Sequence, residues 1–181
     1  MSGAASHIAN PWRNRLIGLL VAAVVFAIDV AIKDWVVYGL RLWEIGQLRL
    51  LPFFNLTWTQ NFGVSLGLFT AGSPEARWVL VALTGAIAGF VLVWLLRERK
   101  LADIVALGMV LGGAAGNIRD RIAVGYVVDY ADLHIGNFRP FLIFNLADAA
   151  ITIGVLIILA RSLLSREKPD AAAEPAPENL N

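Results

Sequence analysis

Hydrophobic residues in this chain fall into four long runs separated by polar segments. Each run is long enough to cross a hydrocarbon core about 30 Å thick as a helix. The first follows Arg13 and Arg15 as in a signal peptide, but apolar character resumes beyond Asp29, so we predict a retained helix. The pattern predicts four transmembrane helices, at about 14–37, 75–96, 101–119 and 141–164.

The segment at about 40–69 has a different pattern. Residues 55–60 alternate polar with apolar or β-branched side chains, which is typical of a strand, and residues 47–50 supply a possible partner. We therefore predict a mainly α membrane protein with four transmembrane helices and a small extracytoplasmic β-sheet between helices one and two.

The rest of the chain is expected to form one membrane domain over residues 1–168. A link at about 120–140 joins helices three and four. Residues 169–181 are rich in Ala, Glu, Pro and Asn, cannot bury a core, and are predicted to be disordered.

Glycines mark two possible packing surfaces. Helix three carries Gly108, Gly112, Gly113 and Gly116, which predict close approach to neighbouring helices. Helix two carries a Gly85-x-x-x-Gly89 pair, for which a packing role and chance occurrence are equally good explanations.

Composition narrows the possible chemistry. The chain is 58% hydrophobic and 16% charged, where soluble domains are near half apolar and a quarter charged. It has no cysteine and two histidines, so we expect no disulfide, no thiolate nucleophile, no metal site and no cofactor. A net charge of +1 gives no reason to expect nucleic-acid binding.

The basic residues that flank the helices predict their orientation. Four helices bring the three basic clusters to one side, which the positive-inside rule makes cytoplasmic, along with both termini. The clusters are Arg13 and Arg15, then Arg97, Arg99 and Lys100, then Arg161, Arg166 and Lys168.

Three polar residues on three helices are predicted to reach one depth. At about 1.5 Å per residue, Asp29 lies roughly 21 Å from the cytoplasmic flank, Asn117 roughly 25 Å and Asp148 roughly 20 Å. All three then lie inside the bilayer near its outer face. Carboxylates in such a position are costly unless they are paired or used, so convergence indicates a single site.

Asp129 and Asp148 are the candidate reactive pair. Asp129 is in the link, which can fold back onto helix four and bring it against Asp148. Two carboxylates held close at low dielectric share one proton, as in aspartic proteases. From the residues alone, a catalytic dyad and a proton or ion relay remain equally open.

The other acids have plainer explanations. Asp29 and Lys33 are four residues apart and are predicted to pair on one helix face. Asp120 is predicted to form a structural ion pair with Arg119 or Arg121. Asp103 and Asp132 are predicted to be interfacial and solvated.

Five short motifs resemble those of the bacterial lipoprotein signal peptidases (signal peptidase II), in the same order and topology. Together they extend over nearly the whole chain. They are Asp29-x-x-x-Lys33, Asn61-x-Gly63, Gly116-Asn117-x-x-Asp120-Arg121, Val128-Asp129-Tyr130 and Phe144-Asn145-x-Ala147-Asp148.

The resemblance implies an intramembrane aspartic endopeptidase of the bacterial inner membrane. Such enzymes remove signal peptides from diacylglyceryl-modified prolipoproteins, cutting before the lipid-modified cysteine, and globomycin inhibits them. It implies catalytic roles for Asp129 and Asp148, and a monomer with an active site near the periplasmic face. Roles in substrate binding or dyad support are implied for Asn61, Gly63, Asn117, Arg121 and Asn145.

One departure from the family pattern follows Gly63. Residues Val64, Ser65 and Leu66 stand where the family commonly has an Ala-Ala or Ala-Phe type of sequence, so the contacts of that loop stay open. The resemblance also makes the 40–69 segment look like the family's periplasmic cradle, which would help hold the substrate.

Two other functions would explain part of the sequence pattern. A small proton-coupled transporter would use the acids as a relay, but helix two has no charge between Trp78 and Leu96 and the cytoplasmic halves of the other helices are apolar. A non-catalytic assembly or lipid-binding protein would account for the glycine surfaces but not for two acids at one depth.

Overall fold

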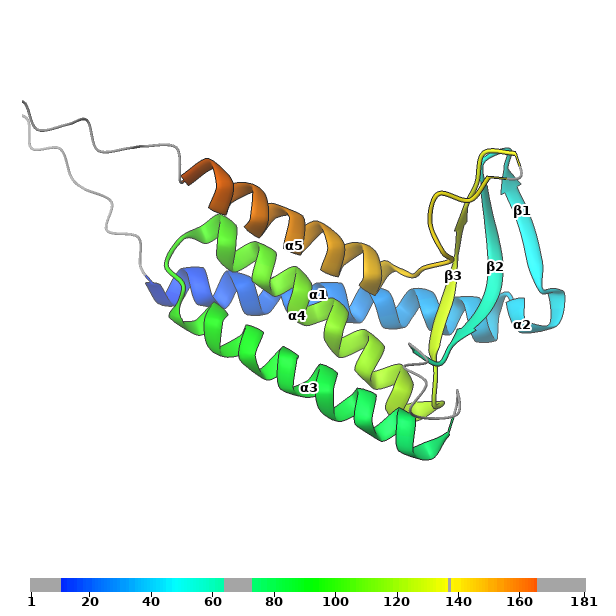
Figure 1. Ribbon diagram of the computed structural model, residues 1–181, viewed down its shortest axis with the longest axis horizontal. Coiled ribbons are helices and arrows are strands. Elements are labelled where there is room, and N and C mark those ends of the chain that lie inside the picture. The colour runs from blue at the N-terminus through cyan, green and yellow to red at the C-terminus, as the bar shows by residue number, and fades with distance from the viewer. Residues whose placement is uncertain (1–10, 64–72, 137, 166–181) are drawn as a thin grey trace, which may run out of the picture.

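The structure is a computed structural model that describes residues 11–63, 73–136 and 138–165 (Figure 1). The predicted tail at 169–181, residues 64–69 of the predicted surface segment, and the basic residues Arg166 and Lys168 lie outside the described residues. The long helices are α1 (Pro11–Asp34), α3 (Pro74–Arg97), α4 (Leu101–Ala123) and α5 (Leu146–Ser165). The short elements are the π-helix η1 (Trp35–Gly39), α2 (Leu42–Ile45), and the strands β1 (Gln47–Leu51), β2 (Phe54–Asn61) and β3 (Val127–Leu133).

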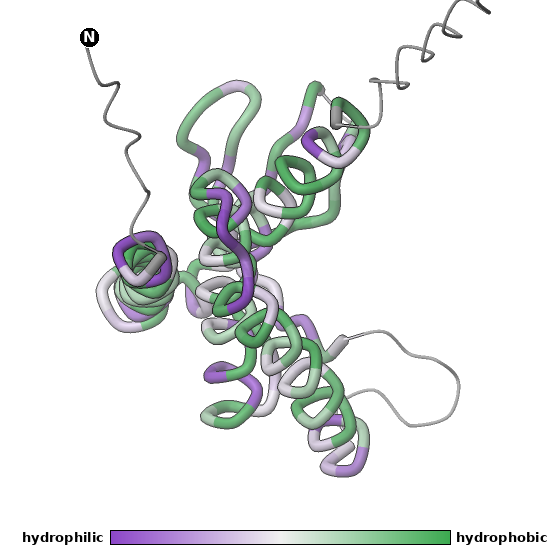
Figure 2. Tube along the Cα trace, turned by 90° about the vertical axis from the view of Figure 1, so that its left-hand side faces the viewer, coloured by the Kyte–Doolittle hydropathy of each residue, from purple (hydrophilic) through white to green (hydrophobic). Residues whose placement is uncertain are grey.

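Four helices among the described residues are long and apolar enough to cross a membrane, which confirms the predicted fold class. The helix α4 lies between the other three and packs against α1, α3 and α5. Figure 2 views the bundle from the end away from the sheet and shows hydrophobic positions predominating along the helices. Where α3 meets α4, Leu95, Ile104 and Leu107 are buried together.

Glycines allow α4 to approach its neighbours closely. A Cβ on Gly112 would lie 2.5 Å from the Ala22 carbonyl oxygen of α1, and one on Gly113 would lie 2.5 Å from the Ala147 carbonyl oxygen of α5. The predicted packing surface on this helix is therefore confirmed. Gly85 has no other described residue within 4 Å of a Cβ position, and the same holds for Gly89, so this pair makes no packing surface within the described chain.

The sheet has three antiparallel strands in the order β1-β2-β3. The predicted pairing of residues 47–50 with 55–60 is confirmed, with Gln47 opposite Thr57. The third strand comes from the link between helices three and four and was not predicted. Because Ala131 of β3 also pairs with Phe144, the chain stays extended there and α5 begins at Leu146 rather than near residue 141.

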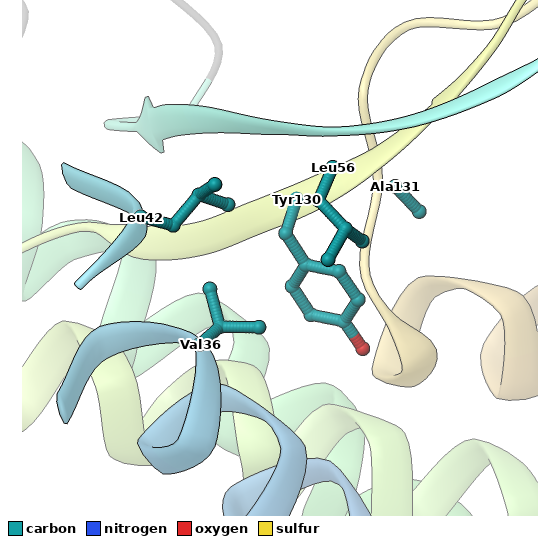
Figure 3. Close-up of a cluster of buried hydrophobic side chains, with 5 residues drawn as sticks. All are labelled: Val36, Leu42, Leu56, Tyr130 and Ala131. Atoms are coloured by element: carbon teal, nitrogen blue, oxygen red, sulfur yellow. The ribbon is translucent and has the colours of Figure 1, made fainter. Parts of the chain in front are cut away.

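A small apolar core fixes the sheet to the end of α1 (Figure 3). It consists of Val36 of η1, Leu42 of α2, Leu56 of β2, and Tyr130 and Ala131 of β3. Figure 1 shows the strands running across the end of the helix bundle. The core therefore holds β3, and the Asp129 that precedes Tyr130, directly against the helix ends.

Substituting Gly113 by alanine should destabilise the bundle. The added methyl group would force α4 away from the Ala147 carbonyl of α5, and overpacking of this kind costs about 1–3 kcal/mol. Thermal unfolding of the purified protein in detergent measures the effect. The control is Gly85→Ala, which meets open space and should not lower the melting temperature. Equal stability of the two variants would contradict this account of the packing.

Candidate active site

The site lies where α4, the start of α5 and the ends of β2 and β3 meet. The structure brings together Asn61 from β2, Asn117 from α4, Asp129 from β3, and Asn145 and Asp148 at the start of α5. These residues are up to 87 positions apart (61 to 148) but are joined by direct side-chain hydrogen bonds.

Asp129 is buried and accepts two amide hydrogen bonds. The Asn145 Nδ2 donates to its Oδ1 at 2.6 Å, and the Asn61 Nδ2 donates to its Oδ2 at 3.0 Å. Burial, and then the nearby Asp148 carboxylate, raise the pKa of Asp129 to about 6, against the lowering effect of the two amides. Asp129 therefore titrates in the range where a carboxyl group can hold or release a proton near neutral pH.

Asp148 is held by the way in which α5 begins. The Asn145 side-chain oxygen accepts the Asp148 backbone N–H at 2.9 Å, and the Asp148 Oδ2 accepts the Asn145 backbone N–H at 3.3 Å. This reciprocal pair is a capping box, with Asp148 in the first turn where a negative charge is favoured. The Asn117 Nδ2 donates to the remaining oxygen, Oδ1, at 2.8 Å.

Lys33 is the centre of a buried ionic cluster beneath the two acids. Its ammonium lies 2.8 Å from the Asp29 Oδ2 and 2.9 Å from the Asp120 Oδ2, and it donates to the Asn117 Oδ1 at 3.0 Å. The Lys33, Asp29 and Asp120 side chains are at most 2% exposed. The predicted Asp29–Lys33 contact is present, and it extends to a second helix through Asp120.

The two acids of this cluster also bind backbone groups. The Asp29 Oδ1 accepts the Ala147 N–H of α5 at 3.0 Å, and the Asp120 Oδ2 accepts the Val128 N–H of β3 at 3.3 Å. The cluster thereby joins α1, α4, α5 and β3 next to the candidate dyad.

Arg121 and Gly63 lie at the edge of the site. The guanidinium of Arg121 interacts electrostatically with Asp148 and Asp129, and its Nε is buried with no hydrogen-bond partner among the described residues. Gly63 has a φ of +91°, and its N–H donates to the Asn61 Oδ1 at 2.8 Å. The Asn61-x-Gly63 spacing therefore orients the amide that contacts Asp129.

Two predictions about acidic residues need correction, and that for Asp120 does not. The predicted structural ion pair of Asp120 is present with Arg119 at 3.4 Å, and Asp120 also pairs with Lys33. Asp132 is buried rather than solvated, because Arg139 binds it at 2.9 and 3.2 Å.

The second correction concerns Asp103, which is not free in solvent. It forms an ion pair with Arg161 of α5 at 2.5 Å. The Asp103 side chain is 16% exposed.

Two cavities flank the acids. A cleft of about 840 Å³ is lined by residues 59–63, Asp129 and residues 139–143. A largely apolar groove of about 310 Å³ reaches Asp148 from the α5 side, and Phe141 and Leu142 line both. In the described ranges, no group of three or more His, Cys, Asp or Glu side chains is arranged to hold a metal ion.

Comparison with known proteins gives consistent matches. The family model described as Signal peptidase (SPase) II matches residues 21–164. A lipoprotein signal peptidase of Sphingopyxis alaskensis is 53% identical over 160 residues, covering 88% of this chain and 92% of the relative. One from Rhizorhabdus wittichii is 51% identical over 162 residues, covering 89% and 93%.

A solved structure also matches the fold. It is described as a bacterial membrane enzyme determined by the in meso method at 1.9 Å resolution, and it superposes with a TM-score of 0.69 at 28% identity. The alignment covers 83% of this chain and 94% of that one.

Substituting Lys33 by methionine should be strongly destabilising. It leaves two buried carboxylates, Asp29 and Asp120, without their shared cation, and breaking such a cluster costs about 3–5 kcal/mol. The control is Arg41→Met, which removes an exposed cation paired with Glu44 and should change stability by about 0.5 kcal/mol or less. Similar melting temperatures for the two variants would show that the buried cluster does not stabilise the fold.

Proposed function

Because the chain belongs to the signal peptidase II family, we propose that it is an intramembrane aspartic endopeptidase with Asp129 and Asp148 as its catalytic dyad. Family membership and four apolar helices make it a multi-pass bacterial membrane protein of a family that acts on lipoprotein signal peptides. One observation supports the aspartic mechanism above all. The side-chain amide of Asn145 donates to Asp129, and the backbone N–H of Asn145 donates to Asp148, so one residue holds the two carboxyl groups side by side.

The hydrogen bonds suggest how the two acids divide the work. Asp148 lies in the first turn of α5 and accepts hydrogen bonds from the Asn117 amide and the Asn145 backbone N–H, which fix the direction of its carboxylate oxygens. Asp129 has a pKa raised to about 6 and is the better holder of the shared proton. We assign Asp148 as the general base and Asp129 as the general acid.

Hydrolysis then proceeds in two steps. Asp148 takes a proton from water as the water oxygen attacks the scissile carbonyl carbon, and Asp129 gives its proton to the carbonyl oxygen. When the carbon–nitrogen bond breaks, the leaving nitrogen takes the proton from Asp148. The new carboxyl group returns a proton to Asp129, so the dyad regains its starting state.

The cavities suit a substrate that lies partly in lipid. The groove beside Asp148 has apolar walls and the larger cleft beside Asp129 is more polar, so the dyad lies between an apolar and a mixed surface. We propose a diacylglyceryl-modified prolipoprotein as the substrate, cleaved immediately before the lipid-modified cysteine. Arg121, with its unpartnered Nε, is proposed to bind the substrate backbone, and globomycin-type compounds are proposed to occupy the same cleft.

The depth of the buried polar groups supports a peptidase over a transporter. In the described part of the chain, buried polar side chains on the helices are Asn14 near one end and the cluster around Lys33 toward the other. Between them lies an apolar core that includes Leu107 and Val110, where a relay would need polar groups. We propose that the site faces the periplasm, that both termini are cytoplasmic, and that the enzyme acts as a monomer.

Replacing either acid of the dyad should abolish cleavage. Asp129→Asn or Asp148→Asn should each lower the rate of prolipoprotein cleavage by about 10⁴-fold or more, because the two groups act as a unit. The assay uses purified protein in detergent with a diacylglyceryl-modified prolipoprotein and no ion gradient. Asp34→Asn, which neutralises a half-exposed acid paired with Arg119, serves as the control and should retain activity. Appreciable turnover by either dyad variant would refute the assignment.

The pH profile should identify the residue that holds the proton. If Asp129 must be protonated, kcat/KM falls as the pH rises through its pKa of about 6. The Asn61 amide lowers this pKa, so Asn61→Ala should move the falling limb to higher pH. Asn14→Ala removes an amide at the other end of the bundle, where it donates to the Arg99 carbonyl, and should leave the limb in place. A limb that stays fixed or moves to lower pH in Asn61→Ala would rule out Asp129 as the acid.

A further inference from the structure

A polar pocket of about 300 Å³ lies on the sheet next to the cleft that contains Asp129, and Arg139 lines both. The strands β1 and β2 and the segment that follows β3 line it. Its polar side chains are Gln47, Arg49, Asn55, His134 and Arg139. Neither Asp129 nor Asp148 contributes to it, so the proposed proton transfers do not use this pocket.

The strand register gathers these side chains on one face. Arg49 of β1 lies opposite Asn55 of β2, and Asn55 lies opposite Asp132 of β3. Side chains directly opposite one another across antiparallel strands share a face of the sheet. The neighbouring set of paired residues faces the other side of the sheet. In it Leu56 lies opposite both Leu48 and Ala131, and these side chains belong to the apolar core. The pocket is therefore built on the polar face.

Positive charge is in excess in this pocket. Asp132 is fully paired, since it accepts two hydrogen bonds from Arg139 and one from the Thr57 hydroxyl at 3.0 Å. Arg139 remains 53% exposed, and its Nη1 has no partner in the described part of the chain. Arg49 is exposed and forms no ion pair with any described residue. The pocket therefore offers two guanidinium groups against one carboxylate.

Asn55 supplies a second indication of a ligand. The residue is only 6% exposed and lines the pocket, yet its side chain makes no hydrogen bond with any described residue. The amide is not one of the fully enclosed polar groups without a partner, so it opens onto the pocket. A bound group with acceptor oxygens would satisfy this amide and the excess positive charge together.

Exposed apolar side chains surround this end of the sheet. They are Leu50, Leu51, Phe53, Ile135 and Phe138, and each is at least 49% exposed. In Figure 1 the end of the sheet with the β1–β2 turn projects past the near end of α5, where the spanning helices stop. An apolar rim around basic groups at the level of the helix ends is the pattern of a surface that meets lipid headgroups.

We propose that this pocket binds the phosphate group of a membrane phospholipid, with Arg49, Arg139 and Asn55 donating to its oxygens. The exposed Leu51 and Phe53 then contact the apolar part of the same lipid. The site anchors the free end of the sheet to the membrane and goes beyond the proposed peptidase function. It requires only that the helices span a bilayer.

Lipid retention by the purified full-length protein tests the proposal. Native mass spectrometry in detergent with added phosphatidylglycerol should show one retained lipid that Arg49→Gln weakens by about fivefold, the usual effect of one basic residue at a membrane surface. Arg41→Gln is the matched control, since it removes an exposed arginine outside the pocket, and it should retain the lipid as the unmodified chain does. Equal retention by the two variants would overturn the proposal.

Further arms identify the bound group. Diacylglycerol, which lacks the phosphate, should not be retained by the protein. If the protein retains diacylglycerol as well as it retains phosphatidylglycerol, the phosphate assignment is wrong. Displacement of the lipid by equimolar inorganic phosphate would make this a site for free oxyanions instead. If the Arg49→Gln variant retains the lipid but cleaves acidic prolipoproteins more slowly, the pocket binds the substrate rather than a lipid, and the lipid proposal fails. An inactive Asp148→Asn protein should retain the lipid normally, which separates this proposal from that of catalysis.

Discussion

The orientation of three asparagine amides is the constraint on which the site depends. The side-chain oxygen of each amide accepts a hydrogen bond from a fixed donor. This fixes which way the amide faces and directs its nitrogen toward a carboxylate. Gly63 N–H binds the oxygen of Asn61, the Lys33 ammonium binds that of Asn117, and Asp148 N–H binds that of Asn145. The three nitrogens consequently donate to Asp129, Asp148 and again Asp129. Two acids that would repel one another are held together because each is supplied with fixed donors.

Buried charge is what makes this arrangement rigid. Lys33 is inaccessible and must be paired, and its partners come from α1 and α4. Those partners bind backbone N–H groups at the start of α5 and in β3, which are the two elements that carry Asp148 and Asp129. Any shift of one element would leave a buried ion or a backbone group unsatisfied, at a cost of several kcal/mol. The same cost that makes intramembrane acids rare therefore fixes their geometry here.

Much of this arrangement follows from sequence, because it depends on local patterns. Run length gives the helices, and helix rise gives the common depth of Asp29, Asn117 and Asp148. The missing parts depend on contacts between distant segments. The strand β3 pairs with residues more than 60 positions away, and its own pattern is a short apolar run with two acids. Asp120 meets Lys33 only because glycines such as Gly112 let α4 approach α1 closely.

Asp129 and Asp148 are held on supports of different kinds. Asp148 is fixed by the capping box of a long helix, whereas Asp129 is on a strand held by the small core around Val36 and Leu56. Tyr130 joins the supports, because its hydroxyl oxygen accepts the Leu146 N–H at 3.2 Å. Burial raises the pKa of this phenol to about 12, so it stays neutral near neutral pH. The relative position of the two carboxyl groups is therefore set by Tyr130, which accepts the N–H of the first residue of α5, and by Asn145, which precedes that residue and hydrogen-bonds with both acids.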